Sequence, residues 1–528
     1  MFGQMRATVW PLMDLERPLL FRNAAIHTLD PAVPRADAMV VVGDRVFLVG
    51  AERDVRARLG AVSCDEIDLK QRCVTPGFID SHIHLMWFGS SLLREANLVG
   101  AASVDEVCAR LADLAARTTG WIRGHGFDQS KLAESRFPTR SELDRVSKDR
   151  PIVISRVCGH AGVANSAAIA LLDPAERSAG DAETGLFTEA SLWAFYRRIP
   201  PLSEGEMEQA ILKACDVLLD TGITAVQTLL DTPEQMIGYT RLHRAGRLPI
   251  RVVAMPPWSA VDALHRHGMR TGFGDAWLRL GHAKLFADGS LGAQTALLAE
   301  PYADKSGTCG QRIYDPDDLK HCVLQAQQKG FSIAIHAIGD QALREVLDAI
   351  EHALDQDEAG RDNRYHRHRV EHASLCPPDC VDRMAGRGVI ATLQPQFVTS
   401  DTWTPQRIGP QRVPWAYPFR SLLRAGAPVT LSSDCPVEWP SAFEAIASAV
   451  DRHPWSPAER EGLSPLEAIA AYCRGSAYAG LAETRQGDLT AGKLADFVVL
   501  SADPAGLDGA GIRQLKAEQV WVGGRRVR

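Results

Sequence analysis

The segment 76–84, Pro-Gly-Phe-Ile-Asp-Ser-His-Ile-His, constrains the fold of this chain more than any other stretch. It begins as an apolar strand and ends in two histidines separated by one residue. On a β-strand, side chains at positions i and i+2 point to the same face, so His82 and His84 can present ring nitrogens to one point in space. That arrangement suits a divalent metal ion. Because surface pairs with this spacing are common, the rest of the chain has to supply further ligands.

Alternating strand and helix patterns follow this segment. Together with the His82 strand, seven later apolar runs predict eight βα units. This number favours an α/β fold of the (β/α)8 TIM-barrel type, in which chemistry sits at the carboxyl ends of the strands. The alternative is an open doubly wound sheet, but no Gly-x-Gly-x-x-Gly motif follows a strand. The later strands are predicted at residues 222–229, 251–255, 278–287, 331–336, 368–373, 389–393 and 429–433.

The two ends of the chain and one internal stretch do not fit this alternation. Short strands and turns at both ends predict one small β-sandwich domain, built from residues 1–75 and 481–528. The barrel then comprises residues 76–95 and 201–480. Residues 96–200 are far more than one βα unit needs, so we expect them to form an inserted α+β subdomain after the first barrel strand, covering the active site.

Composition excludes several partner classes. The net charge of −7 gives no electrostatic case for binding nucleic acid or an anionic membrane. No run approaches the ~18–20 apolar residues that a membrane-spanning helix needs. Eleven scattered cysteines without a Cys-x-x-Cys pair indicate reduced thiols, and therefore a cytoplasmic location. We expect a small-molecule substrate and a homodimer.

Four of the later predicted strands end with residues that could hold a cation. Lys284 lies in the fourth strand, His336 closes the fifth, His372 closes the sixth, and Asp434 follows the eighth. Because the carboxyl ends of barrel strands meet at one mouth, these side chains are expected to converge with His82 and His84. Four strand ends of this kind are a far stronger signal than any one of them.

Together, these motifs resemble the amidohydrolase superfamily, and within it the YtcJ-like, amidohydrolase-3 branch. The resemblance implies a metal-dependent hydrolase of C–N bonds other than peptide bonds. It implies that His82 and His84 hold one ion, that His336 and His372 hold a second, and that Asp434 touches the first ion and a metal-bound water. The further matching segments are 159–166, 284–296, 335–340, 370–373, 432–437 and 492–500.

The resemblance also gives Lys284 a specific role. An ammonium group cannot ligate a cation, but related enzymes carboxylate such a lysine with CO₂ to make a bridging anion. Nearby cations disfavour the ammonium form, which makes the amine reactive. The alternative is an ion pair with Asp288. Imidazole-rich ligation favours Zn²⁺, as one or two ions per chain, although manganese, cobalt or iron fit the same donors.

The expected reaction is attack of a metal-bound hydroxide on an amide carbonyl. Asp434 is the predicted base and then the acid for the leaving nitrogen. His160 is predicted to bind or polarise the carbonyl oxygen; the alternative is a histidine at a helix start. His125 and Asp128 are expected to line the pocket, and Trp403 and Trp439 to form an apolar substrate wall. By contrast, His368 lies among arginines and is expected to be solvated.

The leading hypothesis is therefore hydrolysis of an amide-type C–N bond, as in an N-acyl compound, a formamide or a carbamate, in a small and partly hydrophobic substrate. One alternative is a mononuclear-metal deaminase of a small cyclic or heterocyclic amine. Another is a non-catalytic metal-dependent binding protein. The complete set of six candidate ligands argues against this last class, because a degenerate relative would be expected to lose some of them.

Overall fold

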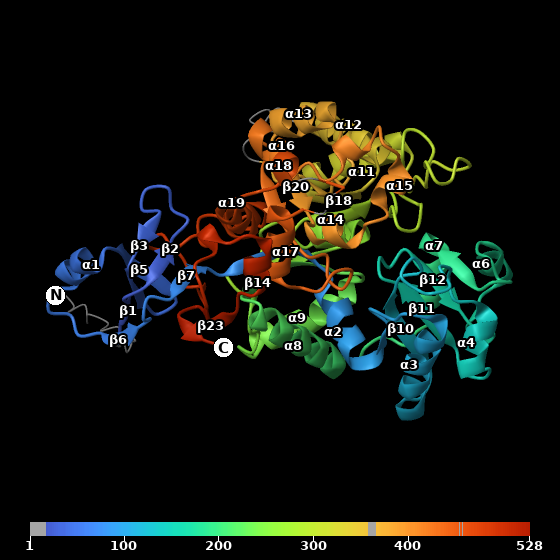
Figure 1. Cartoon of the computed structure of the whole chain (residues 1–528), viewed down its shortest axis with the longest axis horizontal. Coiled ribbons are helices and arrows are strands. Elements are labelled where there is room, and N and C mark those ends of the chain that lie inside the picture. Colours follow the sequence, from blue (N-terminus) through green and yellow to red (C-terminus); the bar gives the residue numbers. More distant parts are fainter. Residues whose placement is uncertain (1–16, 357–365, 453–454, 457) are drawn as a thin grey trace, which may run out of the picture.

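The computed structural model describes residues 17–356, 366–452, 455–456 and 458–528. Figure 1 shows three parts along the long axis of the molecule: strands from both chain ends, a central α/β body, and a separate sheet with its own helices. The central body carries most of the candidate site.

Two parallel sheets form the strands of the central body. The first has the order β16-β15-β14-β8 and the second the order β17-β18-β19-β20-β21. Nearly every residue in these strands is buried, as expected where helices cover a parallel sheet. The strands are β8 (Phe78–Ile83), β14 (Ile223–Leu229), β15 (Arg251–Met255), β16 (Leu278–Leu280), β17 (Ala283–Phe286), β18 (Ile333–Ala337), β19 (Arg369–His372), β20 (Ile390–Leu393) and β21 (Val429–Leu431).

Backbone hydrogen bonds connect the two sheets at both edges. At one edge, β16 and β17 are parts of a single predicted strand, and the Lys284 N–H donates to the carbonyl of Pro256 at 2.8 Å. At the other edge, the Asp434 N–H donates to the His82 carbonyl at 2.9 Å, and the His84 N–H to the Cys435 carbonyl at 2.8 Å. The first and last strands of the central body therefore end side by side.

Helices follow most of these strands, as the sequence predicts. Capping residues set several boundaries: a Ser203–Glu206 capping box starts α8, and Gly388 in the left-handed region ends α13. No helix in the described segments is both long and apolar enough to cross a lipid bilayer. The main helices are α2 (Leu85–Arg94), α8 (Glu204–Asp220), α9 (Met236–Arg244), α11 (Pro316–Gln328), α12 (Asp340–Gln356), α13 (Pro378–Arg387), α16 (Phe419–Ala425), α17 (Ala442–Val450) and α19 (Pro465–Ala470).

Strands from both chain ends share one sheet. Its order is β24-β23-β22-β7-β2-β3, and it lies beside a four-stranded sheet of order β5-β4-β1-β6. The Phe21 ring packs edge-on against Phe497 and Trp521 between the two sheets, with centroids 5.0 and 4.9 Å away. The bounds are β1 (Leu19–Arg22), β2 (Ala25–His27), β3 (Arg35–Ala36), β4 (Ala38–Val42), β5 (Arg45–Gly50), β6 (Asp65–Asp68), β7 (Cys73–Pro76), β22 (Phe497–Leu500), β23 (Ala517–Val522) and β24 (Arg525–Arg526).

The residues between α2 and α8 build a third structure, a five-stranded sheet of order β13-β12-β11-β10-β9. Strands β9, β10 and β11 pair in parallel, whereas β12 pairs antiparallel with both β11 and β13. Its elements are β9 (Ala96–Asn97), α3 (Val104–Arg117), β10 (Ile122–Phe127), α4 (Arg140–Val146), β11 (Ile152–Arg156), β12 (Ala161–Ala164), α5 (Ser166–Ile169), α6 (Pro174–Ser178), β13 (Leu186–Thr188) and α7 (Glu189–Tyr196).

The prediction that His368 is solvated is wrong. Its ring is buried, accepts a hydrogen bond from the Ile333 N–H at 3.2 Å, and contacts Gln327 at 2.9 Å. The neighbouring Arg367 instead reaches Glu483 at 2.7 Å. Successive side chains of an extended segment point to opposite faces, so charged neighbours do not report the environment of the residue between them.

A buried ion pair ties the terminal sheet to the central body. Arg251 of β15 makes two hydrogen bonds to Asp496, at 2.6 and 2.9 Å, and the Gly523 N–H donates to the same carboxylate at 2.7 Å. Breaking a buried pair leaves one charge uncompensated. We therefore expect Asp496→Asn to lower the free energy of unfolding by about 3 kcal/mol, measured as a shift of the urea midpoint.

The control for this variant is Asp54→Asn, which removes the ion pair between Asp54 and Arg53 at the protein surface. Exposed pairs contribute little, so its midpoint should stay at the wild-type value. Equal midpoints for both variants would contradict a stabilising role for the buried pair.

Candidate metal centre

Three predicted ligands meet where β8 ends. One donor atom each from His82, His84 and Asp434 lies within 4.8 Å of the other two. His82 Nε2 is 3.1 Å and His84 Nε2 is 3.5 Å from the same carboxylate oxygen of Asp434. Asp434 adopts a left-handed backbone conformation (φ 57°), a strained state often retained at functional sites. Two imidazoles and one carboxylate form a donor set that fits zinc or a similar ion.

Two further predicted ligands, His336 and His372, lie beside this group. The two rings are 4.4 Å apart between centroids, and the His372 ring is 5.1 Å from that of His82. The Nδ1 atom of His372 contacts Gln394 Oε1 at 2.8 Å, and His336 Nε2 contacts the Gly289 carbonyl at 2.9 Å. Such bonds orient a ring and leave its other nitrogen for a ligand. Burial lowers the pKa of His372 to about 3, which keeps it in the neutral form that binds metals.

Lys284 is buried in the same region. Its Nζ lies 4.5 Å from the centroid of the Phe286 ring and has no hydrogen-bond partner among the described residues. Burial lowers the pKa of the Lys284 amine to about 8. The alternative of an ion pair with Asp288 is wrong, because that carboxylate instead accepts the N–H groups of Leu297, Ile338 and Gly339 at 2.8–3.0 Å. The Lys284 amine is buried and has no hydrogen-bond partner within the described part of the chain. This environment fits a lysine that is carboxylated or that lies beside metal ions.

Sequence reasoning missed the role of Glu371. This fully buried carboxylate contacts Nδ1 of His82 and also pairs with Arg369, whose Nη2 is 2.9 Å from it. Burial alone would raise the pKa of Glu371, but the charge of Arg369 and the hydrogen bond with His82 hold it well below its usual value. The ionised carboxylate orients the His82 ring so that Nε2 faces Asp434. The signal that could have identified it is an acidic residue directly before the candidate ligand His372 in a strand predicted to be buried.

His160 reaches this centre from the inserted sheet. It precedes β12, and Asn165 caps the following helix, so His160 is not a helix-start histidine. Its Nδ1 lies 3.0 Å from the Glu189 carboxylate, and its ring centroid is 5.3 Å from that of His336. Burial opposes protonation of His160, but Glu189 raises its pKa to about 9. The insertion therefore places a hydrogen-bond donor at the centre.

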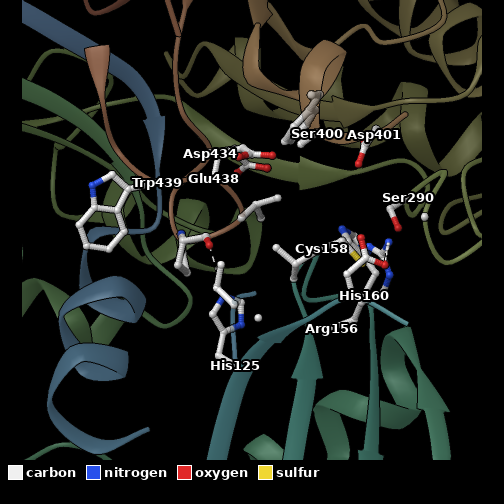
Figure 2. Close-up of a pocket in the computed structure, with 18 of the residues that line it drawn as sticks. His125, Arg156, Cys158, His160, Ser290, Ser400, Asp401, Asp434, Glu438 and Trp439 are labelled. Carbon is white, nitrogen blue, oxygen red and sulfur yellow. Dashed lines mark hydrogen bonds and ion pairs between the residues drawn. The ribbon is translucent and has the colours of Figure 1, made fainter. Parts of the chain in front are cut away.

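One cavity of about 370 Å³ reaches this centre, although His82, His84 and Lys284 are not part of its lining. His336, His372, Asp434 and His160 line it, as do all four predicted substrate-binding residues, His125, Asp128, Trp403 and Trp439. Figure 2 shows Trp439 on one side of Asp434, and Arg156, Ser290 and Asp401 on the other.

The four predicted substrate-binding side chains differ in how they are held. His125 contacts Ser155 at 2.9 Å, and Asp128 pairs with Arg156 at 3.2 Å. Trp403 is buried beneath Arg407, whereas Trp439 is largely exposed at the cavity mouth. Both tryptophans that were predicted to form an apolar wall line the cavity, but the Trp403 ring is buried and the Trp439 ring is exposed.

Comparisons with known proteins find relatives along nearly the whole length of this chain. The model of the amidohydrolase family matches residues 65–528. YtcJ of Bacillus subtilis is 29% identical over 96% of this chain and 99% of its own length. The N-substituted formamide deformylase of Arthrobacter pascens is 28% identical over 97% of this chain and 98% of its own. A solved structure of an uncharacterized metal-dependent hydrolase from Pyrococcus horikoshii has a TM-score of 0.79 at 31% identity, covering 93% of this chain and 99% of that one.

The contact between Glu371 and His82 gives a prediction for metal affinity. We expect Glu371→Gln to weaken the binding of Zn²⁺ about 10- to 100-fold, because the His82 ring loses the group that orients it. Competition with a chromophoric chelator measures this affinity, and circular dichroism checks that the variant is folded.

The matched control is Glu345→Gln. Glu345 is also a buried glutamate paired with an arginine, Arg312, but it belongs to α12 and contacts no candidate ligand. Its zinc affinity should equal that of the wild type. An unchanged affinity in Glu371→Gln would show that Glu371 does not orient the ligand.

Proposed function

This chain belongs to the amidohydrolase family, as a metal-dependent hydrolase acting on C–N bonds other than peptide bonds, and we propose that it cleaves the amide-type bond of a small, partly hydrophobic substrate. The bond is that of an N-acyl compound, a formamide or a carbamate. The observation that carries the proposal is the convergence of His82, His84 and Asp434 on one point beside His336 and His372. The similarity to an N-substituted formamide deformylase favours an amide over a cyclic amine.

The proposed ligand set has two halves. His82, His84 and Asp434 would hold one ion and His336 and His372 a second, and an N6-carboxylated Lys284 would supply a further anionic oxygen ligand. Imidazole-rich ligation favours zinc. The unpartnered amine of Lys284 supports the carboxylated form, because a free buried ammonium would be costly.

The side chains of this protein supply the proton transfers. Bound divalent ions would acidify a water molecule and polarise the substrate carbonyl. Asp434 accepts the proton of the attacking water and later returns it to the leaving nitrogen, so a C–O bond forms and the C–N bond breaks. His160, held by Glu189, donates a hydrogen bond to the carbonyl oxygen as negative charge develops there. The products are an acid and an amine.

We also propose that the two central sheets form one closed (β/α)8 barrel of residues 76–95 and 201–480. The backbone hydrogen bonds at both sheet edges support closure. Residues 1–75 and 481–528 form the sandwich in this division, although residues 1–16 lie outside the described part of the chain. Residues 96–200 are the insertion that covers the site. Eleven free cysteines support a cytoplasmic location.

Replacement of the proposed base tests the mechanism. We expect Asp434→Asn to lower kcat by about 10³-fold, because an amide cannot accept the proton of the attacking water. Turnover is measured on a panel of formamides, N-acyl amines and carbamates with added Zn²⁺ or Mn²⁺. Glu444→Gln is the control, since Glu444 pairs with Arg513 away from the cavity. Near-normal turnover by Asp434→Asn would refute the assigned role.

Replacement of Lys284 tests the bridging ligand. Protein prepared with ¹³C-bicarbonate should show a carbamate carbon resonance that Lys284→Ala lacks, and the metal content should fall from two ions per chain toward one. Lys329→Ala is the control, because Lys329 pairs with Asp262 outside the centre. One ion and an unmodified Lys284 in the wild type would instead favour the mononuclear deaminase.

A further inference from the structure

Apolar side chains gather at the mouth of the cavity. Ten large hydrophobic residues are exposed in the described part of the chain, and three of them, Leu92, Val99 and Trp439, line this one cavity. They are 37%, 54% and 52% exposed, respectively. They come from three separate segments: α2, the loop after β9, and the loop after β21. Single exposed hydrophobic residues are ordinary, but a group that rims a cavity indicates a binding surface.

The structure holds two of these side chains in place. The Trp439 ring packs edge-on against the buried Phe88 ring, with centroids 5.6 Å apart, and its carbonyl accepts the Gln396 amide at 3.1 Å. The Val99 N–H donates to Asn97 Oδ1 at 3.0 Å. Gly126 has φ 101°, and a Cβ there would lie 2.4 Å from Val99 Cγ2, so glycine is needed to seat the valine. The apolar rim is therefore preformed.

The two ends of the cavity differ in chemistry. On the side of Asp434 opposite Trp439, Figure 2 shows Arg156, Ser290 and Asp401. The Arg156 guanidinium is buried and engaged by Gln129 at 2.8 Å and Asp128 at 3.2 Å. A molecule whose reacting carbonyl lies near Asp434 therefore has the buried Arg156, 5.7 Å from the Trp403 ring, on one side and the exposed Trp439 on the other.

We propose that the mouth formed by Leu92, Val99 and Trp439 binds a large apolar group, an alkyl chain or an aryl ring, carried on one side of the scissile C–N bond. This inference rests on the proposed amide hydrolysis and names its substrate class. The three-residue rim is continuous with the catalytic cavity and far smaller than a stable protein–protein interface. A substrate group is therefore the occupant that fits it.

Two matched substrate series test the proposal. One comprises N-alkyl formamides from ethyl to octyl, and the other comprises acyl amides of methylamine from acetyl to octanoyl. In at least one series, kcat/KM should rise by up to about fourfold per added methylene, since each methylene that enters the mouth leaves water. Trp439→Ala and Val99→Ser should each reduce this slope by half or more.

Phe273→Ser is the control, because Phe273 is equally exposed (56%) but lies outside the cavity, and it should leave the slope unchanged. A second measurement separates this inference from the proposed function. Alkyl hydroxamates of increasing length are titrated into the zinc-loaded protein, and their affinities are compared.

The outcomes are distinct. Turnover of short amides without length dependence in either series overturns the apolar mouth and leaves hydrolysis intact. Affinities of the hydroxamates that rise with chain length, with no turnover of any amide, support the mouth and overturn the proposed function. Flat hydroxamate affinities overturn the mouth whether or not amides are cleaved.

Discussion

The centre depends on one short stretch of backbone pairing between segments about 350 positions apart. The N–H of Asp434 bonds to the carbonyl of His82, and the N–H of His84 bonds to the carbonyl of Cys435. These two bonds align the segment after β21 with the end of β8, so three donor side chains reach one point. Because backbone geometry is fixed by hydrogen bonds, the positions of the donors do not depend on flexible loops.

A buried polar network supports this pairing from below. Arg369 contacts Glu371, Gln227 and the carbonyl of Ser81, and Glu371 in turn contacts His82. These groups are all buried, where an unpaired charge would cost several kcal/mol, so each member is needed to satisfy the others. Such a network fixes the orientation of His82 before any ion arrives.

Apolar runs predict most strands of the central body, because buried parallel strands are largely apolar. The strand predicted at 278–287 is instead two strands, β16 and β17, and β19 is a polar exception with the sequence Arg-Val-Glu-His. The predicted strand at 251–255 coincides with β15, and three candidate ligands, His82, His84 and Asp434, have donor atoms within 4.8 Å of one another. The contacts of Glu371 with His82 and of Glu189 with His160 were not predicted. Each contact joins residues that are far apart in the sequence. The local sequence pattern does not determine which side chains of one strand will face a given neighbouring strand or helix. The burial of His368 was missed for the same reason, since its partners come from the neighbouring strand and helix.

The terminal sheet carries a consequence for how the protein is made. β22 pairs with β7, and β7 leads after one residue into β8, which carries His82 and ends just before His84. During synthesis the ribosome releases the His82 segment long before β22 exists. The edge of β7 therefore lacks this partner until residues 497–500 have emerged. The strand that leads into the His82 segment is in this way fully paired only late in synthesis.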